Sequence, residues 1–376
     1  MKSKNLRLVL PLFVILPIVL AVSASAVTIQ VPADQPTIQQ AINAANNGDL
    51  ILVSPGTYFE HIDYQGKAIT IKSVVGPSQT TIDGSNNGTV VKFQTHETLQ
   101  SVLTGFTIQH GRGSSGGGIY ILTASPTITQ NIFRDNFHFV GGFGSAIAGN
   151  VSSPVIEQNA FFANACDNDT QLGAGVVCFI NSSSPLVINN VLRGNACCAI
   201  NMGANQPVVA NNTIAQNSVG VLVSGGSTSQ LYANNIIIQN NVGLFVDFGG
   251  FIWTNNLVFG NTMNYSGIGD QTGLNGNIST DPMFLPTRSR RDFELQVGSP
   301  AIDAGTLSVP NLPPIDIVGN PRVVDGDGNG SVLPDIGAYE FIPPHLGVED
   351  QLDLIGTTDE VTSEPTFASE SSWHRR

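Results

Sequence analysis

The sequence predicts an all-β fold, a parallel β-helix, in which the chain winds through stacked coils of short strands. Two observations predict it. Charged residues make up only 11% of the 376 residues, against roughly 25% in ordinary soluble domains, while 40 glycines and 21 prolines indicate many tight turns. Asparagines recur with a fixed internal period. Low charge excludes a coiled coil and a largely disordered chain.

The repeat is anchored by six asparagines, each followed five residues later by another. The first set is Asn131, Asn159, Asn190, Asn212, Asn235 and Asn256, and the second is Asn136, Asn164, Asn195, Asn217, Asn240 and Asn261. The residues three before and two after each mark are always apolar. A period of 21 to 31 residues is typical of a solenoid.

The stretches between the marks contain β-rich runs broken by Gly, Pro, Ser and Asn, and no helical pattern. This excludes helical repeats and favours a β-helix whose coils stack about 4.8 Å apart. Equivalent asparagines then form a ladder of amide hydrogen bonds, and the apolar positions form a continuous core. Residues 105–108 predict one further, degenerate coil, with His110 where the second asparagine would stand.

The chain divides into five segments. Residues 1–26 are predicted to be a signal peptide, 27–60 an N-terminal cap with a short helix at 36–45, and 61–280 the β-helix. Residues 281–342 break the period and are expected to cap the C-terminal end of the stack, because open strand edges must be covered. The polar residues 343–376 are expected to be a disordered acidic tail.

The N-terminal segment has a basic start, an apolar run at 6–22 and a small-x-small pattern at 24–26, which is typical of a secretory signal. No later apolar run is long enough to span a bilayer. We therefore expect a secreted, extracellular protein, with the periplasm or cell surface as alternatives and no membrane insertion after cleavage. The net charge of −13 disfavours nucleic acid as a partner. We expect a monomer.

The three longest coils carry their extra residues just after the second asparagine, at 111–118, 137–144 and 165–175. Coils in register would place these insertions side by side on one flank. Loops on one face of a solenoid are where binding usually occurs. The insertions predict a substrate-binding face, or else a set of solvated loops, at His110, Arg112, Asp135, His138, Asp167 and Asp169.

Two other sets of residues suggest structural chemistry. Asp325, Asp327 and Asn329 match the oxygen-ligand spacing that begins a calcium loop, with Asp335 as the nearest further acid, so either structural Ca²⁺ or a plain turn fits. Cys166 and Cys197 each follow a second asparagine by two residues in neighbouring coils. Stacking would bring their Cα atoms to about 5 Å, within disulfide range, and the alternative is core packing. The same choice stays open for Cys178 and Cys198.

Short motifs at both ends resemble known proteins. IQQAI at 38–42, GTY at 56–58 and TIDG at 81–84 resemble the start of secreted right-handed β-helix proteins of the pectin-lyase-like superfamily. GSPAIDAG at 298–305, GNPR at 319–322 and DIGAYE at 335–340 resemble the choice-of-anchor Q domain, which closes many bacterial surface or secreted β-helix proteins. The resemblance implies a right-handed β-helix.

The resemblance does not carry an activity over. The superfamily includes lyases, hydrolases and epimerases of acidic polysaccharides, but the polygalacturonase signatures are missing from this chain. We expect the protein to bind an extracellular polysaccharide or surface glycan through the insertion face. The alternatives are a polysaccharide lyase or glycoside hydrolase acting there, and a non-catalytic surface scaffold or adhesin.

Overall fold

The computed structural model describes residues 25–167, 175–225, 229–286 and 292–343. Nearly all of the expected signal peptide, the tail beyond residue 343 and Asp169 lie outside these ranges. Among the described residues, no helix has the length and apolar character needed to cross a bilayer.

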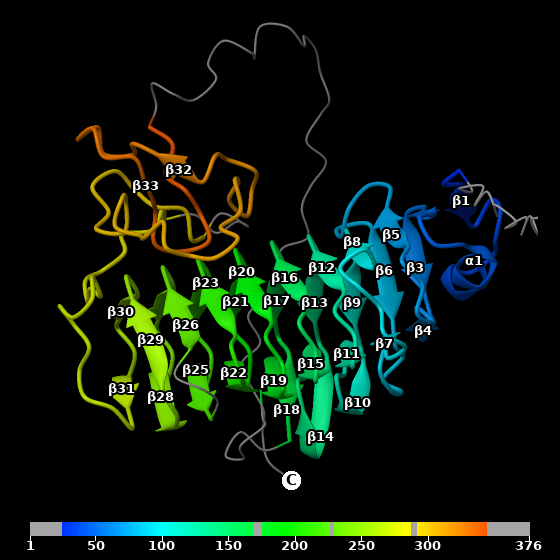
Figure 1. The fold of residues 1–376 in the computed structure, drawn as a ribbon, viewed down its shortest axis with the longest axis horizontal. Helices are drawn as coiled ribbons and strands as arrows, with labels where there is room; N and C mark the ends of the chain where they lie inside the picture. The colour runs from blue at the N-terminus through cyan, green and yellow to red at the C-terminus, as the bar shows by residue number, and fades with distance from the viewer. Residues whose placement is uncertain (1–24, 168–174, 226–228, 287–291, 344–376) are drawn as a thin grey trace, which may run out of the picture.

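Three long parallel sheets build a solenoid, because the chain adds one strand to each sheet in nearly every coil (Figure 1). Sheet A contains β1 (Thr28–Val31), β2 (Leu50–Val53), β5 (Thr70–Ser73), β8 (Val102–Thr104), β12 (Thr127–Thr129), β16 (Val155–Glu157), β20 (Leu186–Ile188), β23 (Val208–Ala210), β26 (Gln230–Ala233) and β29 (Phe251–Thr254). Sheet B contains β3 (Gly56–Tyr58), β6 (Thr80–Asp83), β9 (Thr107–Gln109), β13 (Ile132–Arg134), β17 (Ala160–Phe162), β21 (Val191–Arg193), β24 (Thr213–Ala215), β27 (Ile236–Ile238) and β30 (Leu257–Phe259). Sheet C contains β4 (Ile62–Asp63), β7 (Val91–Phe93), β11 (Ile119–Leu122), β15 (Ile147–Asn150), β19 (Val177–Asn181), β22 (Cys198–Ala204), β25 (Val219–Ser224), β28 (Val242–Phe248) and β31 (Met263–Ser266). The predicted parallel β-helix is confirmed.

The predicted asparagine ladder is also confirmed. Asn190 shows its unit: its Oδ1 accepts from the backbone N of Asn159 at 2.9 Å, and its Nδ2 donates to Asn212 Oδ1 at 3.0 Å. The first ladder runs from Asn131 to Asn256 and continues to Asn277. The second joins Asn136 through to Asn261. Because these amides are buried, each rung satisfies polar groups that would otherwise be left without partners.

The degenerate coil is displaced by one residue from its predicted register. Thr107 pairs with Ile132, so Phe106 and Gly111 stand opposite the two ladder asparagines of the next coil. The backbone N–H groups of Phe106 and Gly111 donate to Asn131 Oδ1 and Asn136 Oδ1 at 3.0 and 2.9 Å. His110 therefore does not occupy the second asparagine position. It occupies the left-handed turn position before it, with φ 53°, where a side chain faces outward.

The N-terminal end is covered by α1 (Ile38–Ala44), as predicted. Thr37 caps the helix by accepting from the backbone N of Gln40 at 3.1 Å. Ile38 and Ile42 are buried against the first coils and belong to the same core as the stacked rings of Phe133 and Phe161, whose centroids lie 4.8 Å apart.

The C-terminal segment lies in a different place from that predicted. It consists of residues 281–286 and 292–343, is called the cap below, and contains the short hairpin of β32 (Val323–Val324) and β33 (Leu333–Pro334). Instead of covering the end of the stack, it folds back along its side (Figure 1). Ile336 and Ala338 pack on the outward residues Ile236 and Ile238 of sheet B. The reason is that later coils expose apolar side chains outside as well as inside, so their outer face also requires cover.

Candidate functional site

A third column of amides joins the solenoid to the cap. These are the residues immediately before each mark of the first ladder, where the chain turns from sheet A to sheet B. All have φ between 50° and 56°, in the left-handed region that Asn tolerates better than most residues. The members are Gln130, Gln158, Asn189, Asn211, Asn234 and Asn255.

Five of these six amides donate to backbone carbonyls of the cap, at 2.7 to 3.1 Å. The pairs are Gln158 with Asp316, Asn189 with Ile315, Asn211 with Asp335, Asn234 with Thr306, and Asn255 with Ala304. The cap reaches as far as Gln158 and stops there. Gln130, one coil nearer the N-terminus, is exposed, and its side chain has no hydrogen-bond partner among the described residues.

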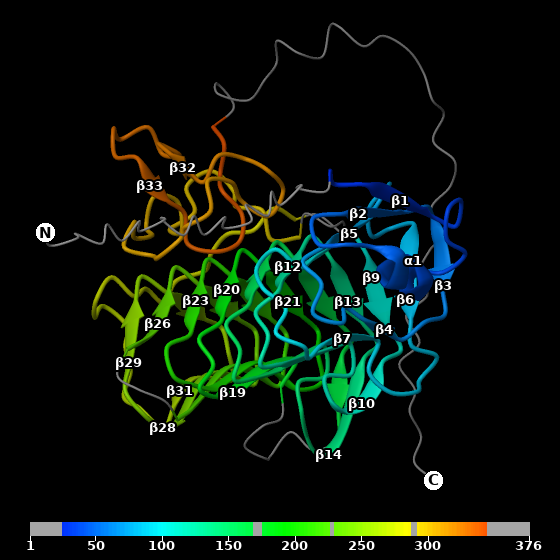
Figure 2. The ribbon, with the colours of Figure 1, turned by 45° about the vertical axis from the view of Figure 1, so that its right-hand side comes forward.

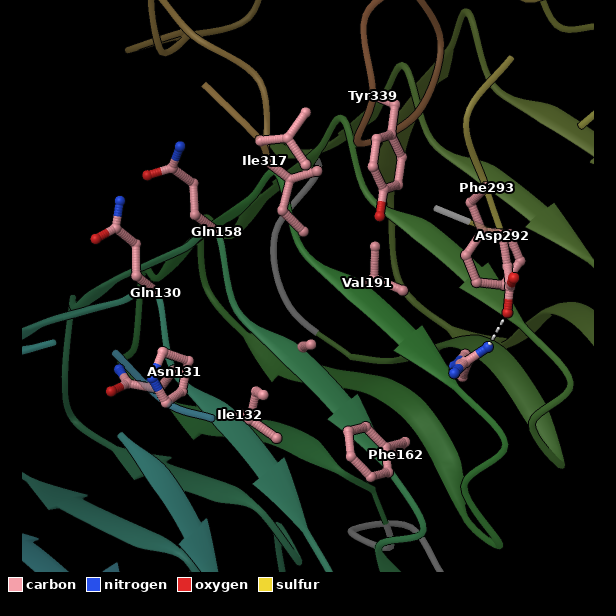
Figure 3. A pocket seen from close by; sticks show the side chains of 14 residues that line it. Gln130, Asn131, Ile132, Gln158, Phe162, Val191, Asp292, Phe293, Ile317 and Tyr339 are labelled. Carbon is pink, nitrogen blue, oxygen red and sulfur yellow. Dashed lines mark hydrogen bonds and ion pairs between the residues drawn. The ribbon is translucent and has the colours of Figure 1, made fainter. Parts of the chain in front are cut away.

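A cleft of about 400 Å³ opens where the cap stops (Figure 3). Its floor is the outer face of sheet B, which contributes Ile132, Ala160 and Phe162. Its wall is the edge of the cap, including Ile317 and Tyr339. Figure 3 shows Gln130 and Gln158 side by side at one end of this cleft. The cleft therefore joins an apolar floor to a polar margin.

An ion pair marks the other end of the cleft. Arg193, from sheet B, donates to Asp292 Oδ2 of the cap at 2.7 Å. Both side chains are partly exposed, so the pair contributes little stability by itself, but it presents charged hydrogen-bonding groups at the margin. Burial raises the pKa of Tyr339 to about 12, so its phenol stays neutral at physiological pH and keeps its proton.

The insertions predicted to lie side by side do so. They form a small parallel sheet of β10 (Arg112–Ser115), β14 (Phe137–Phe143) and β18 (Ala165–Cys166), in which Arg112 pairs with Phe137 and His138 with Cys166. Figures 1 and 2 show this sheet on the side of the stack opposite the cap. The sequence thus predicted a real surface feature, but none of its residues lines the cleft.

Most predicted binding groups on this face interact with the protein itself. The Arg112 guanidinium lies 4.5 Å from the ring centroid of Phe137 and 5.2 Å from that of Phe139, a cation–π arrangement. Asp167 accepts from the backbone N of Val140 at 3.4 Å. His138 is only 2% exposed, and burial lowers its pKa, so its imidazole is neutral and packed inside.

His138 lies beside a disulfide between Cys166 and Cys197, whose Cα atoms are 6.0 Å apart. Since the two sulfurs are bonded to each other, they do not supply the thiolates that a His–Cys metal site would need. Cys178 and Cys198 are both buried, as a core-packing role requires. Burial raises the pKa of the Cys178 thiol to about 12.

His110 and Asp135 lie apart from the insertion sheet, at the corner where sheet B ends. His110 Nδ1 lies 2.9 Å from Asp83 Oδ2, and Asp83 also accepts from Gln109 and Ser85. Burial opposes ionisation of Asp83, but these hydrogen bonds outweigh it and lower its pKa. Because Gln109 pairs with Arg134, the next residues, His110 and Asp135, are neighbours in adjacent coils, about 5 Å apart.

The predicted metal ligands are only partly brought together. One carboxylate oxygen each of Asp303, Asp325 and Asp327 lies within 4.8 Å of the other two. Asn329 instead donates to Asp327 Oδ2 and accepts from Ser331. Asp335 is buried, and its oxygens accept from the backbone N–H groups of Asp303 and Phe341. Asp303 thus takes the place predicted for Asp335.

Two features of the structure, the cleft and the part played by Asp303, were not predicted from the sequence. The cleft went unpredicted because the cap has no repeat to fix its position. The sequence did contain a signal for the amides at the edge of the cleft, because Asn or Gln directly precedes each of the six predicted asparagines of the first ladder. Asp303 was also visible, within the GSPAIDAG motif, but nothing in the sequence placed it beside residues 325–327.

Comparison with solved structures finds similar proteins at low identity. Pectate lyase Pel9A aligns with TM-score 0.47 and 15% identity, over 81% of this chain and 91% of that one. The A-module of mannuronan C-5 epimerase AlgE6 from Azotobacter vinelandii aligns with TM-score 0.36 and 16% identity, over 59% and 70%. A mannuronic acid specific polysaccharide family 6 lyase from human gut microbiota gives 0.31 and 14%, over 64% and 82%.

No curated protein matches the sequence. A family model described as "Right handed beta helix region" matches residues 37–236, more than half of the chain. These residues contain α1, the N-terminal coils and most of both asparagine ladders. The chain therefore belongs to the right-handed β-helix family.

Proposed function

We propose that this protein is secreted and binds a polysaccharide or surface glycan, and that it holds a segment of the glycan in the cleft between the cap and sheet B. The observation that carries the proposal is the composition of the cleft, which combines a flat apolar floor with a margin of amides and an ion pair. The proposed binding site therefore lies on the outer face of sheet B beside the cap, and not on the insertion face.

The chemistry of a sugar ring fits this composition. A pyranose has an apolar C–H face and a polar edge of hydroxyl groups. Phe162 and Ile132 offer surface to the apolar face, since aromatic rings add large contact area with a defined geometry. Gln130 and Gln158 supply amide donors and acceptors for hydroxyls, and Arg193 and Asp292 supply charged ones.

The cleft is also largely preformed. Its floor belongs to three adjacent strands of a hydrogen-bonded sheet, β13, β17 and β21. Its wall is fixed by the hydrogen bond from Gln158 to Asp316 and by the apolar contacts of the cap. A rigid site loses little conformational entropy on binding, which favours affinity for a flexible glycan chain.

A glycan array with the mature protein tests the proposal, followed by titration of any glycan it retains. Replacement of Gln130 or Phe162 by Ala is expected to weaken binding about tenfold each, a loss of about 1.4 kcal/mol. Gln100→Ala and Phe59→Ala alter an exposed amide and an exposed ring elsewhere and should leave the affinity unchanged. No retention of any glycan, or equal effects of the control variants, would contradict the proposal.

A second candidate function rests on the corner of Asp83, His110 and Asp135. A carboxylate that orients a half-exposed imidazole, with a second carboxylate in the next coil, is suited to general acid–base chemistry on a glycan. Incubation with each retained glycan and analysis for new reducing or unsaturated ends tests this activity. Products that persist in His110→Ala would exclude this corner as their source.

A further inference from the structure

We propose that the cap contains a calcium site formed by Asp303, Asp325 and Asp327, which fixes the loop of the β32–β33 hairpin to the rest of the cap. This site is independent of glycan binding. It retains the two aspartates predicted from the sequence spacing and replaces Asn329 and Asp335 with Asp303.

The three carboxylates come from two segments of the cap, and one oxygen of each lies within 4.8 Å of the other two. Asp325 and Asp327 begin the loop that joins β32 to β33, whereas Asp303 lies more than twenty residues earlier. Oxygens at this separation can reach a single cation, because calcium binds oxygen ligands at about 2.3–2.6 Å.

Two buried carboxylate oxygens in this group lack hydrogen-bond partners. Asp303 is only 9% exposed. Its Oδ2 accepts from the backbone N–H groups of Gly326 and Asp327, both at 2.9 Å, while its Oδ1 is buried without a hydrogen bond. Asp325 repeats the pattern: Oδ2 accepts from Gly330, and Oδ1 is buried with no partner. A buried carboxylate oxygen without a donor is unfavourable, and a cation would satisfy both.

No Lys, Arg or His forms an ion pair with these three carboxylates within the described part of the chain. Three acids gathered without a basic side chain repel one another, and a divalent cation removes that repulsion.

The backbone of the loop is built to approach Asp303 closely. A Cβ added at Gly326 would lie 2.7 Å from Ile302 Cγ2, so only glycine brings this backbone against residues 302 and 303. The Gly326 and Asp327 N–H groups thereby fix the orientation of the Asp303 carboxylate. All-oxygen ligation, in which carboxylates supply the charge, favours calcium over zinc or copper.

Calorimetric titration of the full mature protein, first treated with EDTA, tests the site. We expect one equivalent of Ca²⁺ to bind per chain and the melting temperature to rise in its presence. Asp325→Asn and Asp327→Asn should each weaken Ca²⁺ binding at least tenfold, whereas Asp247→Asn, which removes an exposed carboxylate from β28, should not. Circular dichroism of each variant establishes that it folds.

Two outcomes would overturn the inference. One is that the unmodified protein shows neither binding heat nor a shift of its melting temperature with calcium. The other is that calcium binds with unchanged affinity to the folded Asp325→Asn and Asp327→Asn variants, because the ion would then occupy a different site.

Discussion

The side-chain amide of Gln158 donates to the backbone carbonyl of Asp316 at 2.7 Å, and so joins the solenoid to the cap across 158 positions of sequence. This hydrogen bond lies at the last coil that the cap covers. The equivalent amide of the preceding coil, Gln130, is exposed at the open end of the cleft. One repeated turn position therefore serves two purposes: to hold the cap, and to present a polar group beside the cap's edge.

The ladder asparagines are expected to dominate the stability of the solenoid. Asn190 is fully buried, and its Nδ2 donates to Ile156, Ile188 and Asn212 while its Oδ1 accepts from Asn159. Asn190→Ala should lower the free energy of unfolding by about 3 kcal/mol, since it leaves several buried groups without partners. Asn46→Ala, at an exposed position outside the ladders, is the control. Thermal melts of equal midpoint for the two variants would refute this.

The disulfide should contribute stability through the coils that it joins. Cys166 and Cys197 close a loop with a sequence separation of 31, for which chain entropy predicts about 3–4 kcal/mol. The double variant Cys166→Ser with Cys197→Ser should melt at a lower temperature than the oxidised protein. Reductant should lower the melting temperature of the unmodified protein and leave that of the variant unchanged. A reductant effect of equal size on both proteins would show that the stabilisation comes from elsewhere.

The cap should become less stable as the pH rises from about 5 to about 9. Arg322 is fully buried and bonds to Glu340 at 3.2 Å. Burial and, to a smaller extent, the nearby charge of Asp335 raise the pKa of Glu340 to about 9, although Arg322 opposes this rise. The folded protein therefore keeps a proton that the unfolded chain releases near pH 4.3. This contribution to stability is complete below the unfolded pKa and is lost as the pH rises through the folded one.

Glu340→Gln isolates this effect, because the amide does not titrate. Melts with EDTA present should show a smaller loss of stability between about pH 5 and pH 9 for the variant than for the unmodified protein. The exposed-site variant Asp247→Asn should follow the unmodified protein. Parallel pH profiles for Glu340→Gln and the unmodified protein would contradict the assignment.

The sequence predicted those features that repeat. Asn131 and its equivalents fix the register because an inward amide at this turn needs a partner amide one coil away, and nothing but stacking supplies one. The same regularity placed the insertions together and predicted that Cys166 and Cys197 lie close enough to bond. The predicted register was wrong by one residue at His110. This coil lacks both ladder asparagines, so Gly105 can be mistaken for the residue at the first asparagine position.

The features that could not be predicted depend on contacts between non-repeating segments. Ile336 and Ala338 find their place against Ile236 and Ile238 through complementary apolar surfaces, and no spacing in the sequence encodes such a contact. The cleft could not be predicted for the same reason, since one of its walls is the cap. Asp303 joins Asp325 and Asp327 for the same reason: the hairpin brings them together only after the cap has folded.

Glycan binding in the cleft is tested most directly by a variant whose larger side chain fills the cleft. Ile132 lies on its floor, partly exposed, and Ile132→Trp would place an indole in the space of about 400 Å³. The matched control is Ile252→Trp on the outer face of sheet A, where the isoleucine is already half exposed. Affinity for the retained glycan is measured for both, together with the melting temperature. We predict at least tenfold weaker binding for Ile132→Trp alone, with folding preserved in both variants. Equal affinity of the two folded variants would show that the glycan does not bind in this cleft.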